Sequence, residues 1–341
     1  MFRRVGLFLA MLCVAYTAVV VVIDPYGYFG GSSFPNMQPN DARYSKQPLL
    51  AAMRRQGKVE GLVLGSSRSM TIPSEELQAR TGARFFNFAV QAGWAEDYLA
   101  MYRLARRDGV TPRIVVVGLD VRDMFQSGDV PNAVYTHDAT FDGLLRYGPT
   151  ISRERAMFEA LARFKSLFRA EHFANALRAV ALRIRPDPLP FVRYEPAGYI
   201  EHPQFEAQIA AGTYPLDTQV SGCAEAQLRY YRPDTARLAP TRQRYLAQLV
   251  EEVTSDGARL VVFLTPTRQP VLGALEATEF PRLRADLLAY LETLRARHPF
   301  AVVDATDPAS FGATTDGWYD CVHFGRAVGA RLAWRLANEV R

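Results

Sequence analysis

The 341-residue sequence has only three cysteines and five histidines. They are not grouped at metal-ligand spacing, and no glycine-rich phosphate-binding loop is present. The 40 basic and 35 acidic residues are nearly balanced and spread along the chain, which argues against a nucleic-acid-binding surface. We therefore expect no metal, no cofactor and no nucleic-acid partner.

The longest stretch without charge lies at the N-terminus. After "MFRR", residues 5–23 read "VGLFLAMLCVAYTAVVVVI", nineteen residues that come close to spanning a bilayer as a helix. A signal peptide usually has a shorter apolar core, whereas this run keeps β-branched residues to its end. We favour an uncleaved transmembrane anchor over residues 1–23, with the signal peptide as the alternative. Arg3 and Arg4 then mark the cytoplasmic side, so the remaining chain is expected in the periplasm, held at the inner membrane by one span.

Two cysteines, Cys223 and Cys321, belong to the exported part. In an oxidising compartment they could form a disulfide. Two unrelated buried thiols fit the sequence equally well, so both alternatives stay open.

The rest of the chain predicts an α/β domain in two pieces. Residues 24–40 are rich in Gly, Pro, Asn and Ser and predict a tether. Strands and helices then alternate over residues 41–125 and again over 241–341. The five expected strands are continuously apolar, as in parallel sheets covered on both faces, and lie at 59–65, 84–90, 113–120, 259–266 and 300–305. This pattern indicates a doubly wound sheet.

Residues 126–240 interrupt the alternation and predict an inserted, mainly helical cap. Two sets of apolar residues fall at helical spacing, which indicates two amphipathic helices or one kinked helix: Met157, Leu161, Phe164 and Phe168, then Phe173, Leu177, Val180 and Ile184. The basic residues on their other faces suit either a membrane surface or a solvated cap, and we favour the cap. Beyond "RPDPLP", no clear periodicity is visible up to about residue 235.

Polar residues that directly follow strands are the best candidates for chemistry, because ligands of open parallel sheets bind beyond the carboxyl ends of the strands. Three such segments are Ser66–Ser69, Asn87–Trp94 and Gly118–Asp123. Near the C-terminus, "GWYDCVHFG" holds Asp320 and His323 three residues apart. A nucleophilic serine needs a base to take its proton and a carboxylate to orient that base, and this pair could supply both.

These motifs, in this order, resemble the SGNH or GDSL-type hydrolases, whose fold is a flavodoxin-like sheet with a Ser-Asp-His triad. Gly65-Ser66-Ser67 matches the family's first block, which implies Ser67 as nucleophile, and Asp320 with His323 matches the last block in full. The resemblance places an oxyanion-hole N–H on Gly93, with Ala92 as the alternative, beside that of Ser67. The third block is Gly-x-Asn in the family but Gly118-Leu119-Asp120 here. An ionised Asp120 cannot donate a hydrogen bond, so its role in the oxyanion hole is in doubt.

Behind one N-terminal membrane helix, the Gly-Ser-Ser form is similar to the D-alanine transfer protein of teichoic acids and to alginate O-acetylation proteins. This resemblance implies an esterase or O-acyltransferase that acts on a cell-envelope polysaccharide, with a membrane-bound acyltransferase as partner. The alternative is a catalytically weak module that binds a glycan or such a partner. A third alternative is structural, with Ser67 capping its turn and His323 an ordinary loop histidine.

Three residues beside the motifs have two interpretations each. Arg68 could hold an anionic substrate group or form an ion pair with Asp120 or Asp123, and we favour the ion pair. Trp94 and Trp318 could stack on sugar rings or serve packing alone.

Overall fold

The computed structural model describes residues 2–25, 34, 42–125, 139–148, 153, 156–157, 160–161, 170–185, 192–231 and 237–340. Most of the expected tether 24–40 and part of the expected cap 126–240 lie outside these ranges. Phe164 and Phe168 of the first amphipathic segment are among the residues outside.

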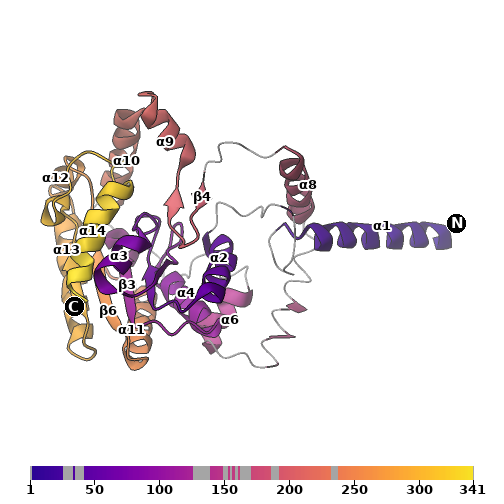
Figure 1. The fold of residues 1–341 in the computed structure, drawn as a ribbon, viewed down its shortest axis with the longest axis horizontal. Coiled ribbons are helices and arrows are strands. Elements are labelled where there is room, and N and C mark those ends of the chain that lie inside the picture. Colours follow the sequence, from indigo (N-terminus) through magenta and orange to yellow (C-terminus); the bar gives the residue numbers. More distant parts are fainter. Residues whose placement is uncertain are drawn as a thin grey trace.

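A five-stranded parallel sheet forms the centre of the molecule, in the order β2-β1-β3-β6-β7 (Figure 1). Its strands coincide with the five apolar runs of the sequence: β1 Gly61–Leu64, β2 Phe85–Asn87, β3 Ile114–Leu119, β6 Arg259–Leu264 and β7 Ala301–Asp304. Counted within the sheet alone, the order is 2-1-3-4-5. The strand order therefore reverses between β1 and β3, where ligands of such sheets usually bind.

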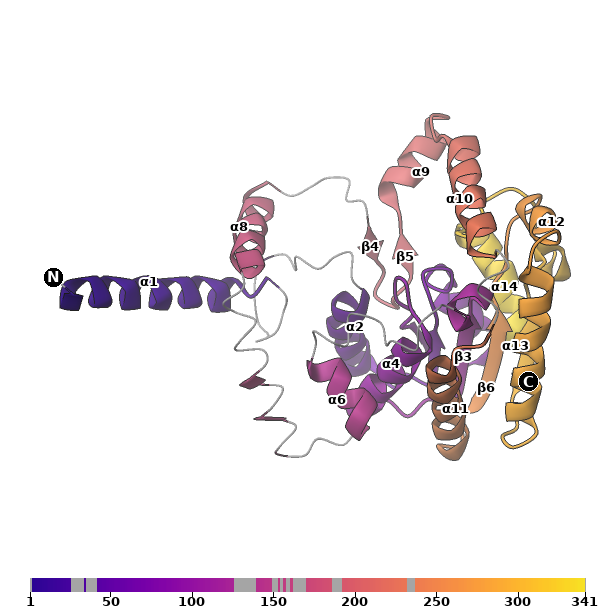
Figure 2. The same ribbon diagram turned by 180° about the vertical axis from the view of Figure 1, so that it is seen from behind.

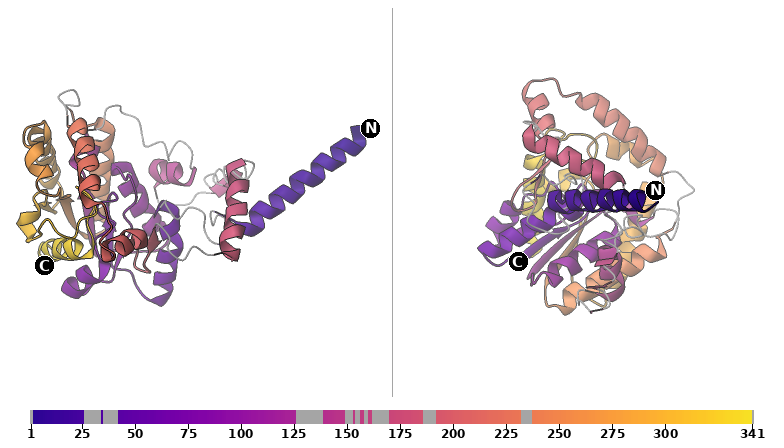
Figure 3. Two further views of the ribbon diagram at one scale, coloured as in Figure 1. Left: turned by 90° about the horizontal axis from the view of Figure 1, so that it is seen from above. Right: turned by 90° about the vertical axis from the view of Figure 1, so that its right-hand side faces the viewer.

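Helices cover both faces of the sheet, because alternate strand residues point to opposite sides. Leu62 and Leu64 pack in a core with helices that lie on one face: α2 (Ala42–Gln56), α4 (Ala95–Arg107), α6 (Ala139–Tyr147), α11 (Pro240–Ser255) and α13 (Phe280–Arg295). Val63 packs in a second core with α3 (Ser74–Thr81) and α14 (Arg326–Asn338). The sheet between its two helical layers is visible in the right panel of Figure 3. The α/β prediction is confirmed at this level.

Between β3 and α11, the described residues form η1 (Val121–Met124), α6, α8 (Ala170–Ile184), a two-stranded ribbon and two further helices. The ribbon consists of β4 (Arg193–Tyr194) and β5 (Ile200–Glu201), and α9 (Pro203–Ala210) with α10 (Leu216–Tyr230) forms a hairpin beside the sheet (Figure 2). The sequence had shown no periodicity here. The reason is that α10 buries only Gln227 and α9 buries no residue, so neither helix needs an apolar stripe.

Helix α1 (Phe2–Ile23) projects away from the α/β domain (Figure 1). Its stretch Arg4–Ile23 is long and apolar enough to cross a membrane, a property that an N-terminal signal sequence shares. The remaining short elements are α12 (Val271–Leu275) and η2 (Pro308–Phe311).

Candidate active site

The turn after β1 presents one side chain to solvent. From Gly61 to Ser74 every residue is buried except Ser67, which is half-buried. Gly65 has a φ of +148°, and a Cβ there would lie 2.2 Å from the Ser69 hydroxyl oxygen. A Cβ on Gly118 would lie 2.1 Å from the same oxygen. Glycines at the ends of β1 and β3 thus let Ser69 pack inward, and the turn leaves Ser67 facing out.

Asn87, at the end of β2, holds this turn in place through hydrogen bonds. Its side-chain amide donates to the carbonyls of Ser69 and Ile72, both at 2.9 Å. Asn87 is fully buried, so these bonds replace water and fix the turn backbone. The sequence marked Asn87 only as the start of a polar segment.

The loop before α14 holds Asp320 and His323. The backbone N–H of Tyr319 donates to the carbonyl of His323 at 2.9 Å, and Gly325 donates to Gly317 at 2.7 Å, which closes the loop. Within it, one oxygen of Asp320 accepts the backbone N–H groups of Val322 and His323, each at 2.7 Å. The Asp-x-x-His spacing is therefore what lets Asp320 hold both the loop backbone and the imidazole.

Ser67, His323 and Asp320 form a continuous hydrogen-bonded chain. His323 Nδ1 lies 2.7 Å from Asp320 Oδ2, and His323 Nε2 lies 2.9 Å from Ser67 Oγ. Because a carboxylate can only accept, the proton belongs on Nδ1, and Nε2 is left to accept the Ser67 hydroxyl proton. This is the protonation that a serine nucleophile requires.

Asp320 is held in its ionised form. Burial raises the pKa of its carboxyl, but hydrogen bonds and charge from His323, with the two backbone N–H groups, outweigh burial and lower the pKa below its usual value. The carboxylate can therefore stabilise an imidazolium on His323.

The loop between β2 and α4 lies beside the turn that holds Ser67. The N–H of Val90 donates to the carbonyl of Gly65 at 2.9 Å, and a Cβ on Gly93 would lie 2.9 Å from that carbonyl. Tyr98 fixes the loop by donating its hydroxyl to the Gly93 carbonyl at 2.8 Å. Within the residues that the structure describes, the N–H groups of Ser67 and Gly93 donate no hydrogen bond. Ala92 has a φ of +45° and an interaction of its own.

Asp120 is committed to other partners, so it is not an oxyanion donor. It accepts the Thr265 hydroxyl at 2.6 Å and lies 3.6 Å from Arg68 Nε. Burial raises the pKa of Asp120, but the charge of Arg68 and the hydrogen bond from Thr265 outweigh burial, so the pKa lies below its usual value. An ionised carboxylate offers no proton to an oxyanion.

Arg68 has the structural role that the sequence favoured. Besides its ion pair with Asp120, the guanidinium donates to the Thr265 hydroxyl and to Gln227 Oε1 of α10, each at 3.3 Å. Only 8% of the side chain is exposed. Arg68 thus ties the turn that holds Ser67 to Thr265, which follows β6, and to the α9–α10 hairpin.

The two tryptophans differ in their surroundings. Trp318 is 2% exposed, donates to the Thr314 carbonyl at 2.9 Å and packs edge-on against Phe324. The sugar-stacking interpretation is therefore wrong for Trp318, because its ring supports the loop from inside. Trp94 is half-buried, and the guanidinium of Arg242 lies 4.0 Å from its ring centre.

A disulfide joins the loop that holds Asp320 and His323 to the inserted segment. Cys321, between Asp320 and His323, is bonded to Cys223 of α10. The Tyr214 hydroxyl adds a hydrogen bond to the carbonyl of Tyr319 at 2.8 Å, and the Tyr319 hydroxyl bonds Glu206 of α9. Sequence reasoning missed these tyrosine contacts, and the position of Cys321 inside the Asp-x-x-His motif was the only signal.

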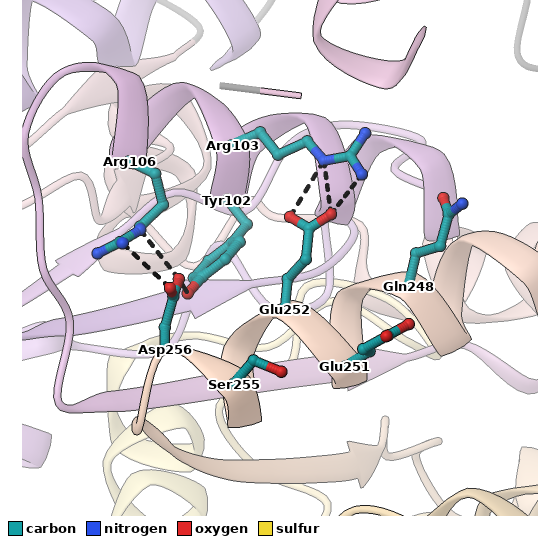
Figure 4. A pocket seen from close by; sticks show the side chains of 8 residues that line it. All are labelled: Tyr102, Arg103, Arg106, Gln248, Glu251, Glu252, Ser255 and Asp256. Carbon is teal, nitrogen blue, oxygen red and sulfur yellow. Dashed lines mark hydrogen bonds and ion pairs between the residues drawn. The ribbon is translucent and has the colours of Figure 1, made fainter. Parts of the chain in front are cut away.

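A separate cavity of ≈ 470 Å³ lies between α4 and α11 (Figure 4). It is lined by the carboxyl-terminal halves of these helices, which in an α/β sheet lie towards the edge opposite Ser67. Two ion pairs line it, Arg103 with Glu252 and Arg106 with Asp256. Arg103 also donates to the carbonyls of Leu144 and Leu145. The network therefore joins α4, α6 and α11.

Comparison of the chain with models of known protein families found no match, and comparison with curated proteins found none either. Among the described residues, no three His, Cys, Asp or Glu side chains are grouped as metal ligands would be.

Proposed function

We propose that the chain is an SGNH-type serine esterase or O-acyltransferase, anchored in the inner membrane with its α/β domain in the periplasm. The observation that carries this proposal is the chain of hydrogen bonds from Ser67 Oγ through His323 to Asp320, at 2.9 and 2.7 Å. The sheet order 2-1-3-4-5, which is that of flavodoxin-like sheets, supports it.

The geometry suits acyl transfer through a covalent intermediate. Ser67 Oγ attacks the ester carbonyl while His323 Nε2 takes the hydroxyl proton, and Asp320 stabilises the resulting imidazolium. The N–H groups of Ser67 and Gly93 receive the oxyanion. The intermediate collapses to an acyl-Ser67 and an alcohol, which leaves with the proton from His323. Water or a sugar hydroxyl then loses its proton to His323 and attacks the acyl carbon. As the bond from the acyl carbon to Ser67 Oγ breaks, His323 returns the proton to Oγ.

A cell-envelope polysaccharide is the proposed acyl donor or acceptor, and a membrane-bound acyltransferase is the proposed partner. The resemblance to envelope-acylating proteins supports both assignments, and so does an apolar N-terminal helix that would keep the domain at the membrane. Hydrolysis and transfer use the same triad and differ in whether water or a sugar reaches the acyl-enzyme.

The first test is labelling of the full chain, in detergent, with a fluorophosphonate probe, followed by mass spectrometry of the adduct. We expect an adduct on Ser67 that is lost in Ser67→Ala and in His323→Ala. Ser69→Ala is the matched control, because this hydroxyl lies in the same turn and is buried without a hydrogen-bond partner. Absence of an adduct on folded wild-type protein would reject the enzyme.

One observation favours a second candidate, a catalytically weak module that binds a glycan or the acyltransferase. Asp120 stands where the family has an asparagine donor and is held by Thr265 and Arg68. Loss of one oxyanion donor costs about a hundredfold or more in rate. Glycan or acyltransferase binding that is identical in wild type and Ser67→Ala, without labelling, would support this candidate.

A further inference from the structure

Helix α8 crosses the carboxyl-terminal end of α1. The rings of Tyr16 and Phe173 are stacked with their centres 5.3 Å apart, and Ile23 packs with Ala176 and Ala179. Figures 1 and 3 show α8 lying crosswise to α1 at the end nearest the α/β domain. If α1 spans a bilayer, a helix crossed over its end runs along the membrane surface.

The side of α8 that does not face α1 is apolar and exposed. Leu177 is 53% exposed and Ile184 is 73% exposed. Ala174 and Ala181 are exposed as well, and the spacing of these four residues puts them on one helical face. On a water-facing cap helix these positions would normally be polar.

In the part of this helix whose side chains the structure describes, residues 173–185, the charges are all positive. Arg178, Arg183 and Arg185 are exposed, and the segment 174–185 contains no acidic residue. An apolar face flanked by arginines is the pattern of helices that lie in the interface of anionic membranes. Basic residues close to such a surface gain energy from the negative lipid headgroups.

We propose that α8 is an interfacial helix that binds the outer surface of the bilayer crossed by α1. Leu177 and Ile184 enter the boundary between headgroups and acyl chains, and the arginines contact anionic headgroups. The inference rests on the anchor part of the proposed function and is independent of the triad. Lipid is the occupant because the contact of α1 with α8 already brings this face to the membrane, and its charge is complementary to the lipid surface. A second helix would fix the domain more closely to the membrane than a single tether does.

The test uses the full chain with Cys13→Ser, which removes the free cysteine and leaves the disulfide intact. Leu177→Cys or Ile184→Cys is labelled with an environment-sensitive fluorophore and reconstituted into vesicles of phosphatidylcholine and phosphatidylglycerol. Ile209→Cys on α9, 44% exposed, is the matched control. Intact mass first establishes that α1 is present.

We expect blue-shifted emission at positions 177 and 184, weak quenching by aqueous iodide and strong quenching by spin-labelled lipid, with the reverse at 209. Replacement of the three arginines by glutamine should reduce the shift. Iodide quenching at 177 and 184 equal to that at 209, with α1 present, overturns the inference and leaves the anchor standing. Protection from both quenchers would mean that protein covers the face, and this also overturns it. A chain that has lost α1 overturns the anchor as well.

Discussion

At the scale of single residues, the proposed role of Asp320 depends on its being an acceptor only. Its second oxygen lies 2.7 Å from His323 Nδ1, while its first holds two backbone N–H groups. In Asp320→Asn the backbone bonds can survive, but the side-chain NH₂ would face Nδ1 and favour a proton on Nε2. We expect fluorophosphonate labelling of Ser67 to slow by about a thousandfold or more, with little change in thermal unfolding. Asp316→Asn, an exposed change in the same loop, is the control, and equal labelling rates in the two variants would contradict this role.

The buried acidic residues Asp120 and Asp123 predict an unusual pH dependence of stability. Burial, together with the Asp120 carboxylate, raises the pKa of Asp123 to about 7. In the unfolded chain this carboxyl ionises near its ordinary value, so the folded state binds more protons between about pH 4 and pH 7. The contribution of Asp123 to the free energy of unfolding therefore falls as pH rises through this window.

Asp123→Asn removes this dependence. Relative to wild type, we expect the variant to gain about 2 kcal/mol of unfolding free energy between pH 5 and pH 8. Urea unfolding at the two pH values measures the gain, with Asp316→Asn as the matched control. A variant-minus-wild-type difference that is equal at both pH values would show that Asp123 is ionised at pH 5.

At the scale of elements, the disulfide should matter to the loop that holds Asp320 and His323 as well as to stability. Cys223→Ser removes the bond that fixes the middle of the segment between Asp320 and His323. We expect a loss of about 2–4 kcal/mol in the free energy of unfolding, because the bridge closes a long loop. Labelling of Ser67 should slow by about tenfold or more, since small displacements of a base are costly.

Urea unfolding and probe labelling, both at a temperature where the variant is folded, test these two effects. Cys13→Ser, which alters a cysteine outside the bridge, should change neither quantity. If the Cys223→Ser protein labels at the wild-type rate, the disulfide has no part in positioning His323.

The same elements explain how far the sequence could be interpreted. The sheet strands were predictable because both faces are buried, which makes each a continuous apolar run, as in Ile114–Leu119. The grouping of Ser67, His323 and Asp320 was predictable because each stands at a strand end or in a local motif. The α9–α10 hairpin was not, since it buries almost nothing. The hydrogen bonds between Asp120 and Thr265 and between Arg68 and Gln227 join residues more than a hundred positions apart, so no local pattern could reveal them.

At the scale of the whole molecule, two interpretations of α1 lead to different proteins. A retained helix gives a single-pass membrane protein whose oxidised bridge reports an extracytoplasmic domain. A cleaved signal sequence gives a chain that begins after the helix and is released. The packing of Ile23 with Ala176 and Ala179 favours retention, because cleavage would expose an apolar surface on α8.

We therefore expect the protein in its native membrane to resist extraction by alkaline carbonate and to have an intact mass that includes residues 2–23. A variant without these residues should stay in the cytoplasm, where thiols are kept reduced, and Cys223 and Cys321 should then react with a thiol reagent without prior reduction. The full-length chain should react only at Cys13 until it is reduced. A carbonate-soluble chain that lacks the helix but carries the oxidised bridge would identify α1 as a signal sequence and confine the proposed acyl transfer to soluble acceptors.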